Sequence, residues 1–170
     1  MYLNHYSCRT KGISRVHPKA SAWVLSPSST TSASAFGGSS FNSPGDCLPF
    51  DGRSGHLLIR LRQRIELDSV GVEHIPQSVA YDISTAPRDF SVSVYDALNR
   101  TSTTRRRVGD FSYRIDATSG PSQIFAIADT SATGTGVPAT HIRFDFASNH
   151  GNAYVTCVYR LKVFGTPIKA

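Results

Sequence analysis

Two residues near the end of the chain, Cys157 and Tyr159, have side chains and a spacing that indicate a binding site. They lie in residues 154–165, a run rich in β-branched and aromatic residues that predicts a strand. Alternate side chains of a strand point to the same side, so the thiol and the phenol should lie side by side. The same side carries Val155, Leu161 and Val163. We expect this strand to form the wall of a binding site that Cys157 fastens in place.

The chain has three cysteines, Cys8, Cys47 and Cys157, and their spacing does not predict a metal centre. They form no CxxC pattern, and no histidine pair at zinc-ligand spacing lies beside them. The odd count leaves two interpretations open. Either all three are buried thiols in a reducing compartment, or two form an internal disulfide and the third is available to another chain.

The sequence carries no pattern typical of catalysis. Its carboxylates are scattered, and it contains neither a nucleophile-elbow motif nor an HExxH motif. We therefore expect a binding protein and not an enzyme.

Length and composition predict one globular domain, with 170 residues, 39% hydrophobic and 18% charged. No apolar run is long enough to span a bilayer and residues 1–8 lack the order of a signal peptide, so we expect any membrane anchor to lie outside this chain. The net charge of +6 comes from scattered basic residues, apart from residues 105–107, three arginines that we interpret as a solvated turn. A nucleic-acid site would need denser charge interleaved with aromatic residues, so no nucleic-acid partner is expected.

The first 43 residues differ from the rest. Residues 26–43 are rich in serine, threonine and glycine, which predicts a loop. Residues 13–25 carry the larger apolar side chains of this part, including Trp23, Val24 and Leu25. Residues 21–26 could form a short strand, although propensity alone favours a frayed N-terminal arm.

From Cys47 onward, short β-rich runs, several of them with alternating apolar residues, are separated by turn residues. The predicted strands are residues 56–64, 65–75, 90–95, 110–116, 123–127, 141–146 and 154–165. The pattern predicts an all-β fold, an antiparallel β-sandwich of the jelly-roll type with an irregular N-terminal arm.

Four segments together resemble one family. Residues 45–52 read GDCLPFDG, residues 72–76 read VEHIP, residues 84–90 read STAPRDF, and residues 154–165 follow near the end. In this order and at these separations they resemble the SUN domain, the lumenal part of an inner nuclear membrane protein. A spaced set of motifs is much harder to match by chance than a single motif.

The resemblance implies a β-sandwich of the galactose-binding-like type, usually trimeric, that binds the C-terminal tail of a KASH protein in the perinuclear space. Such a pair forms the LINC bridge, which couples nucleoskeleton to cytoskeleton and positions the nucleus. A KASH tail ends in prolines and a free carboxylate, and a carboxylate binds best to hydroxyl and N–H donors.

The residues that match the KASH pocket of the family are His74, Thr85 and Tyr159. The family's second tyrosine falls at Val155, so Tyr154 is the remaining candidate for that hydroxyl, provided that a bulge turns it to the same side. Without the resemblance, turn or core roles for these residues would be favoured.

Cysteine roles are also implied by the resemblance. Cys47 and Cys157 match the family's internal disulfide, which for a loop of this length stabilises by on the order of 4–5 kcal/mol. Cys8 lies near the position of the cysteine that cross-links to the KASH partner, and the alternative is a free exposed thiol.

The resemblance divides the chain into residues 1–12, a remnant of an upstream linker, residues 13–43, a lid and loop, and residues 44–170, the sandwich. The lid would clamp the tail by strand addition, with Trp23, Val24 and Leu25 as its apolar part. The family's monovalent cation, K⁺, would be bound by backbone carbonyls. The matching loop contains Phe36, Ser39, Phe41 and Asp46, and the sequence neither supports nor excludes the ion.

A carbohydrate-binding or other ligand-binding accessory module is the alternative, because many functions share the β-sandwich. A sugar platform would show exposed aromatic rings, and the single tryptophan, Trp23, lies in the predicted lid.

Overall fold

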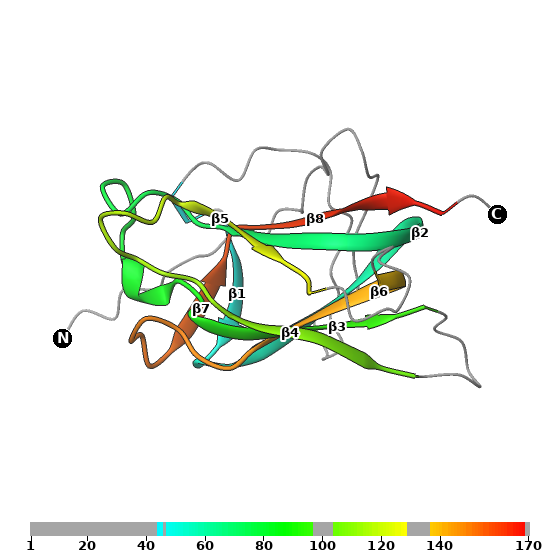
Figure 1. Ribbon diagram of the computed structural model, residues 1–170. Coiled ribbons are helices and arrows are strands. Elements are labelled where there is room, and N and C mark those ends of the chain that lie inside the picture. The colour runs from blue at the N-terminus through cyan, green and yellow to red at the C-terminus, as the bar shows by residue number, and fades with distance from the viewer. Residues whose placement is uncertain (1–43, 46, 97–103, 129–136, 169–170) are drawn as a thin grey trace.

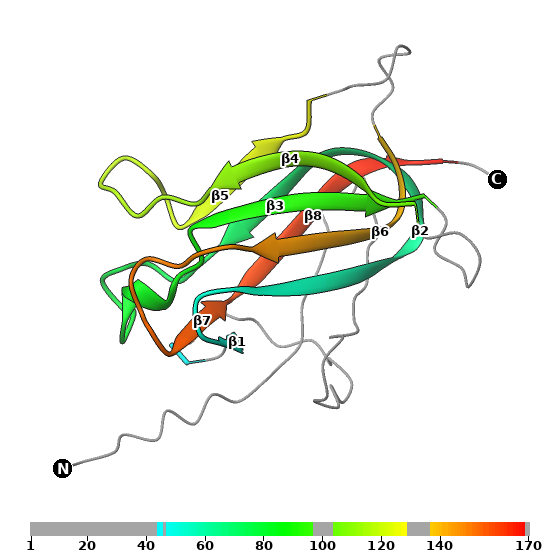
Figure 2. The ribbon, with the colours of Figure 1, turned by 90° about the horizontal axis from the view of Figure 1, so that it is seen from below.

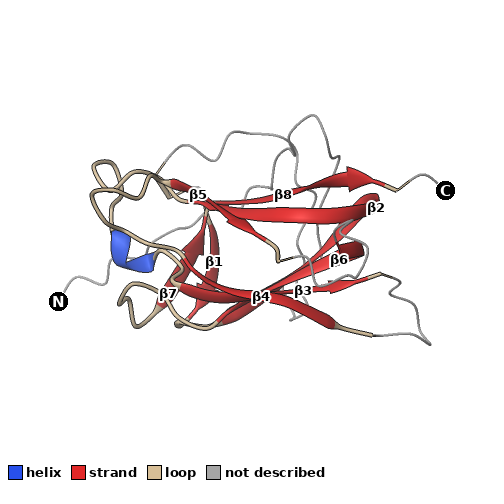
Figure 3. Cartoon of the chain, viewed as in Figure 1, coloured by secondary structure: helices blue, strands red, loops and turns tan. Residues whose placement is uncertain are grey.

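The computed structural model describes residues 44–45, 47–96, 104–128 and 137–168, and strands dominate them (Figures 1 and 3). The elements are β1 Leu48–Asp51, β2 Gly55–Glu73, the 3-10 helix η1 Ile83–Thr85, β3 Asp89–Tyr95, β4 Arg106–Ser112, β5 Ser122–Ala126, β6 Val137–Phe146, β7 Val155–Val158 and β8 Arg160–Pro167. The predicted all-β class is confirmed. None of the described segments forms a helix that is long and apolar enough to cross a membrane.

The long strand β2 belongs to both layers of a sandwich. Its first half pairs with β6, and its second half pairs with β8 and β5. The register with β6 shifts between Arg60 and Ile65, and such an irregularity allows a strand to bend. One hydrogen-bonded sheet, in the order β4-β3-β6-β2-β5 with β8 beside β2, therefore folds over itself. Figure 1 shows β5 and β8 in one layer and β3, β4 and β6 in the other.

The core lies between these layers. Alternation along β2 buries Leu57 and Ile59, whereas the neighbouring Arg60 is exposed. The ring of Phe90 on β3 lies 5.6 Å from that of Phe111 on β4 and 5.2 Å from that of Phe125 on β5. Because β5 belongs to the opposite layer, Phe90 joins the two layers by aromatic packing.

The prediction of one continuous final strand was wrong. The run divides into β7, which pairs with β1 in a separate two-stranded sheet, and β8, which pairs with β2. At the division, Val158 and Tyr159 are consecutive and both buried, so the alternation that would place Val155 on the same side as Leu161 is interrupted. The cause is the change of pairing partner from β1 to β2.

Three other predictions also differ from the structure. β1 was not predicted, β6 begins at Val137 instead of His141, and β4 begins at Arg106 instead of Asp110. The arginines at 105–107 are therefore not a turn, since two of them belong to β4. Arg105 bonds to Ser93 and pairs with Asp145, and Arg107 pairs with Asp110. Asp145 also pairs with Arg143.

Candidate functional site

A disulfide between Cys47 and Cys157 fastens the entry of the sandwich to β7, which confirms the predicted pairing. The two Cα atoms lie 5.5 Å apart, and Cys47 is fully buried. Next to the bridge, Pro49 of β1 lies opposite Cys157 in the antiparallel pair. The crosslink therefore keeps the segment that precedes β1 close to the junction of β7 and β8.

His74 and Tyr159 meet beside this disulfide. Their rings are 4.5 Å apart and nearly perpendicular, and both side chains are buried. Tyr159 lies at the division between β7 and β8, and His74 follows the last residue of β2. The phenol oxygen of Tyr159 also accepts a hydrogen bond of 3.1 Å from the backbone N–H of Gly45. The segment that precedes β1, the end of β2 and the start of β8 thus converge on this pair.

The protonation of His74 is fixed by its surroundings. Its Nδ1 lies 3.0 Å from the carbonyl oxygen of Ile75, which can only accept, so Nδ1 carries the proton and donates. Burial lowers the pKa of His74 to about 4, with the nearby His150 acting in the same direction and the bond to Ile75 opposing it. At neutral pH, Nε2 is therefore a buried acceptor, and it has no hydrogen-bond partner among the described residues.

Thr85 ends the short helix η1, which Asp82 caps. The carboxylate of Asp82 accepts hydrogen bonds from the backbone N–H and the hydroxyl of Ser84, which hold the pKa of Asp82 below its usual value. The hydroxyl of Thr85 donates to the carbonyl oxygen of Asp82 at 2.8 Å. To donate to a ligand, this hydroxyl must leave that carbonyl.

Asn152, which sequence reasoning missed, ties η1 to the loop before β7. Its amide nitrogen donates to Asp82 at 2.9 Å, and its amide oxygen accepts from the backbone N–H groups of Tyr154 and Val155. A signal was present in the sequence, since Asn149 and Asn152 flank Gly151 between two predicted strands, but such residues also occur in ordinary turns.

A second asparagine, Asn149, which is buried, completes this network. Its amide nitrogen donates to the carbonyls of Asn152 and Val155 and to the hydroxyl of Thr156. Thr156, which is fully buried, donates in turn to the carbonyl of Gly52 in the turn between β1 and β2. Hydrogen bonds therefore connect η1, the β6–β7 loop and the β1–β2 turn around the Cys47–Cys157 bridge.

Tyr154 is placed differently from Tyr159. Its side chain is 85% exposed, and its backbone carbonyl accepts from the N–H of Gly52. The cluster that contains Tyr159, Cys47 and Ile75 does not include it. The structure thus brings His74 and Tyr159 together, places Thr85 on the adjoining helix, and leaves Tyr154 outside the cluster.

Several predicted residues lie outside the described part of the chain. These are Cys8, the lid residues Trp23, Val24 and Leu25, and the cation-loop residues Phe36, Ser39, Phe41 and Asp46. Within the described ranges, no group of three or more histidine, cysteine, aspartate or glutamate side chains could hold a metal ion.

A small pocket of about 190 Å³ lies beside residues 75–77. Its walls are residues 75–77, Ile83, residues 113–116 and residues 119–121. Tyr113 donates to the carbonyl of Pro121, and burial raises the pKa of Tyr113 to about 12. The volume is below that of pockets for drug-sized ligands but would admit one or two side chains of a peptide.

Comparison with solved structures gives the class of fold. The family 32 carbohydrate-binding module of Streptococcus pneumoniae EndoD superposes with a TM-score of 0.61 at 13% identity, covering 87% of this chain and 98% of that one. The F5/8 type C domain of a Bacteroides fragilis protein superposes with a TM-score of 0.53 at 13% identity, covering 72% of this chain and 75% of that one. The protein is thus a galactose-binding-like jelly roll, and identities this low show the fold alone.

Sequence comparison then gives the family. The family model Sad1 / UNC-like C-terminal matches residues 26–167, so the chain belongs to the Sad1/UNC-like family of SUN domains. SUN domain-containing protein 2 of Arabidopsis thaliana is 38% identical over 152 residues, covering 89% of this chain and 30% of that protein. The Caenorhabditis elegans nuclear migration and anchoring protein unc-84 is 30% identical over 128 residues, covering 74% of this chain and 11% of that protein. The chain therefore spans less than a third of these relatives.

Proposed function

We propose that this SUN domain is a non-enzymatic module that binds the C-terminal tail of a KASH protein and thereby links the nucleus to the cytoskeleton. The observation that carries the proposal is the contact between His74 and Tyr159, held beside the Cys47–Cys157 bridge. The relative unc-84 is named for nuclear migration and anchoring, which agrees with such a role.

The pair supplies chemistry that suits a terminal carboxylate. A phenol is both donor and acceptor, and an imidazole donates from Nε2 once it is protonated. Hydrogen bonds to an ionised group are stronger than neutral ones, and in a buried site they are less weakened by water. Thr85 is the third donor of the proposal, because its helix is tied to the start of β7 through Asp82 and Asn152.

The proposal includes the assembly, lid, cross-link and ion that the family resemblance implies. The domain acts as a homotrimer in the perinuclear space, anchored in the inner nuclear membrane by a segment outside this chain. Residues 13–31 close over the tail, Cys8 cross-links to the partner, and the loop at residues 36–46 holds K⁺ through backbone carbonyls. Light scattering tests the homotrimer, intact-mass measurement of the complex tests the Cys8 cross-link, and K⁺ titration tests the ion.

The test of the main proposal uses one proline-rich tail peptide in two forms, with a free and with an amidated C-terminus. Calorimetry should show binding of the free acid and a loss of about tenfold or more on amidation, because a charge-assisted hydrogen bond contributes about 1.5–3 kcal/mol. Tyr159→Phe should weaken binding of the free acid and leave that of the amide nearly unchanged. Equal affinity for both peptides, together with sugar binding, would favour the carbohydrate-binding alternative.

A further inference from the structure

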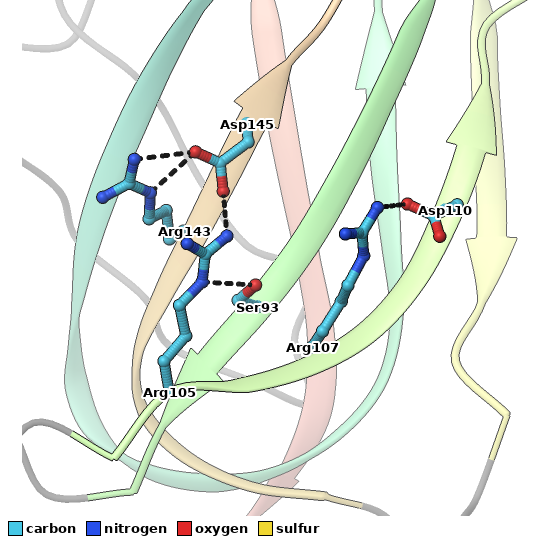
Figure 4. A network of polar contacts seen from close by, with 6 residues as sticks. All are labelled: Ser93, Arg105, Arg107, Asp110, Arg143 and Asp145. Carbon is cyan, nitrogen blue, oxygen red and sulfur yellow. Dashed lines mark hydrogen bonds and ion pairs between the residues drawn. The ribbon is translucent and has the colours of Figure 1, made fainter.

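The outer face of the β4-β3-β6-β2 layer gathers arginines from strands that are far apart in sequence. Figure 2 shows this layer broadside. Five arginines of the described chain belong to it: Arg60 and Arg62 on β2, Arg143 on β6, Arg107 on β4 and Arg105 just before β4. Figure 4 shows the last three. The register places Arg60, Arg107 and Arg143 on one side, since Arg143 lies opposite Ser93, Ser93 opposite Arg107, and Arg60 opposite His141. Arg105 joins them through its bonds to Ser93 and Asp145, and Arg62 follows from alternation past the buried Leu61.

Aspartates neutralise only part of this charge. Asp145 receives both Arg105, at 2.5 Å, and Arg143, at 2.8 Å, while Asp110 pairs with Arg107 (Figure 4). Two carboxylates therefore serve three guanidinium groups. Arg60 and Arg62 are exposed, and neither makes an ion pair with any described carboxylate. Asp89, on the same side of β3, pairs with Arg88, so the face keeps an excess of positive charge.

His141 lies beside one of these arginines. It lies opposite Arg60 on the neighbouring strand. Partial burial lowers the pKa of His141, and the positive charge of Arg60 lowers it further. The positive charge of Arg60 is thus close enough to act on the neighbouring His141.

The chemistry of the face selects the kind of partner. Four adjacent strands span about 14 Å, so the guanidinium groups form a broad array instead of a single anion pocket. Ser91 and Ser93 lie between them and are buried. The exposed large apolar residues of the described chain, Val79, Tyr81, Ile124 and Tyr154, lie on other segments. A protein interface usually has an apolar centre, whereas adsorption to a charged bilayer needs only cations.

We propose that this arginine face docks onto an anionic phospholipid surface, with the guanidinium groups bound to headgroup phosphates. Guanidinium binds phosphate through paired N–H donors, and a broad array can bind several headgroups at once. The proposal is independent of the tail-binding site, because none of these residues contacts His74, Thr85 or Tyr159 among the described interactions. In the docked domain, the β4-β3-β6-β2 layer would lie flat against the bilayer.

The test is sedimentation of the full chain with vesicles of phosphatidylcholine, with and without phosphatidylserine. Binding should require phosphatidylserine and weaken with added salt. Because each arginine near such a surface contributes about 1 kcal/mol, Arg60→Gln with Arg62→Gln should weaken binding about 25-fold. The matched control is Arg53→Gln with Arg114→Gln, which removes the same charge from two exposed arginines outside these four strands. The loss of binding free energy in the control should be less than half of the loss in the variant that lacks Arg60 and Arg62.

Three results would overturn the proposal. The first is equal binding to vesicles with and without phosphatidylserine, and the second is equal weakening in the two double variants, which would mean that net charge alone acts. The third is binding of an acidic peptide or RNA, with the same dependence on Arg60 and Arg62, in place of vesicles. Far-UV circular dichroism and thermal unfolding of both variants establish that each is folded, so loss of binding reports on the face.

Discussion

The side chains of Asn152 and Asp82 are joined by a hydrogen bond of 2.9 Å between residues that are 70 positions apart in the sequence. Asp82 caps the helix that ends at Thr85, and Asn152 accepts from the backbone where β7 begins. This contact therefore sets the distance between the Thr85 helix and the strand that leads to Tyr159.

Replacing Asn152→Asp tests this contact without disturbing the turn. The new carboxylate still accepts from the N–H groups of Tyr154 and Val155, but it faces Asp82 with a second negative charge. We expect the free energy of unfolding to fall by about 1–2 kcal/mol in urea titrations. Adding Asp82→Asn exchanges donor and acceptor and should restore most of the loss. Additive losses in the double variant would show that the two side chains do not act together.

Removing the disulfide tests the second crosslink of the site. Cys47→Ala with Cys157→Ala opens the loop between two cysteines that are 110 residues apart in sequence. The chain-entropy model gives a fall in the free energy of unfolding of up to about 4–5 kcal/mol. Urea unfolding with and without reductant measures this loss. Cys8→Ser removes a thiol without opening the bridge and should leave stability within about 0.5 kcal/mol. A double variant as stable as the parent chain would contradict the role given to the bridge.

The fold was largely predictable where alternation is local. The apolar side chains of β2 repeat every two residues from Leu57 to Leu61, and burial follows that pattern. β3 has the same repeat, but all of its residues from Phe90 to Tyr95 are buried, which alternation does not predict. The division at Tyr159 was not predictable, because alternation in a run does not tell which strand each half pairs with. Residues 105–107 were misread because a cluster of arginines resembles a solvated turn until Asp145 and Asp110 are placed beside it.

The site was predictable only through family resemblance. Nothing in the spacing of His74 and Tyr159 indicates that their rings meet, since the contact depends on how β2 and β8 pair. The supporting residues Asn149, Asn152 and Thr156 were missed because polar side chains near a glycine are typical of turns. The roles of Asn149 and Thr156 depend on burial, and that of Asn152 depends on its contact with the distant Asp82, neither of which the sequence shows.

The buried imidazole of His74 predicts a dependence of stability on pH. The unfolded chain binds a proton at this residue below its ordinary pKa of 6.5, whereas the folded chain, with a pKa of about 4, does not. The stabilising contribution is therefore complete above about pH 6.5 and is lost as the pH falls toward about 4, at up to about 1.4 kcal/mol per pH unit. Urea titrations across this range should show a steeper decline for the parent chain than for His74→Phe. An unchanged slope in His74→Phe would contradict the assignment.

The same imidazole predicts that tail binding takes up a proton. With Nδ1 donating to Ile75, Nε2 can donate to a carboxylate only in the charged ring, so the bound carboxylate must raise the pKa of His74 from about 4. Affinity for the free-acid peptide should therefore rise as the pH falls from 7 toward 5, by at most about tenfold per unit, since one proton is taken up. Calorimetry in buffers of different ionisation enthalpy measures that proton directly. His74→Phe should bind more weakly and without this pH dependence, and the amidated peptide should show none with the parent chain. A flat profile for the free acid on the parent chain would mean that His74 does not donate to the carboxylate.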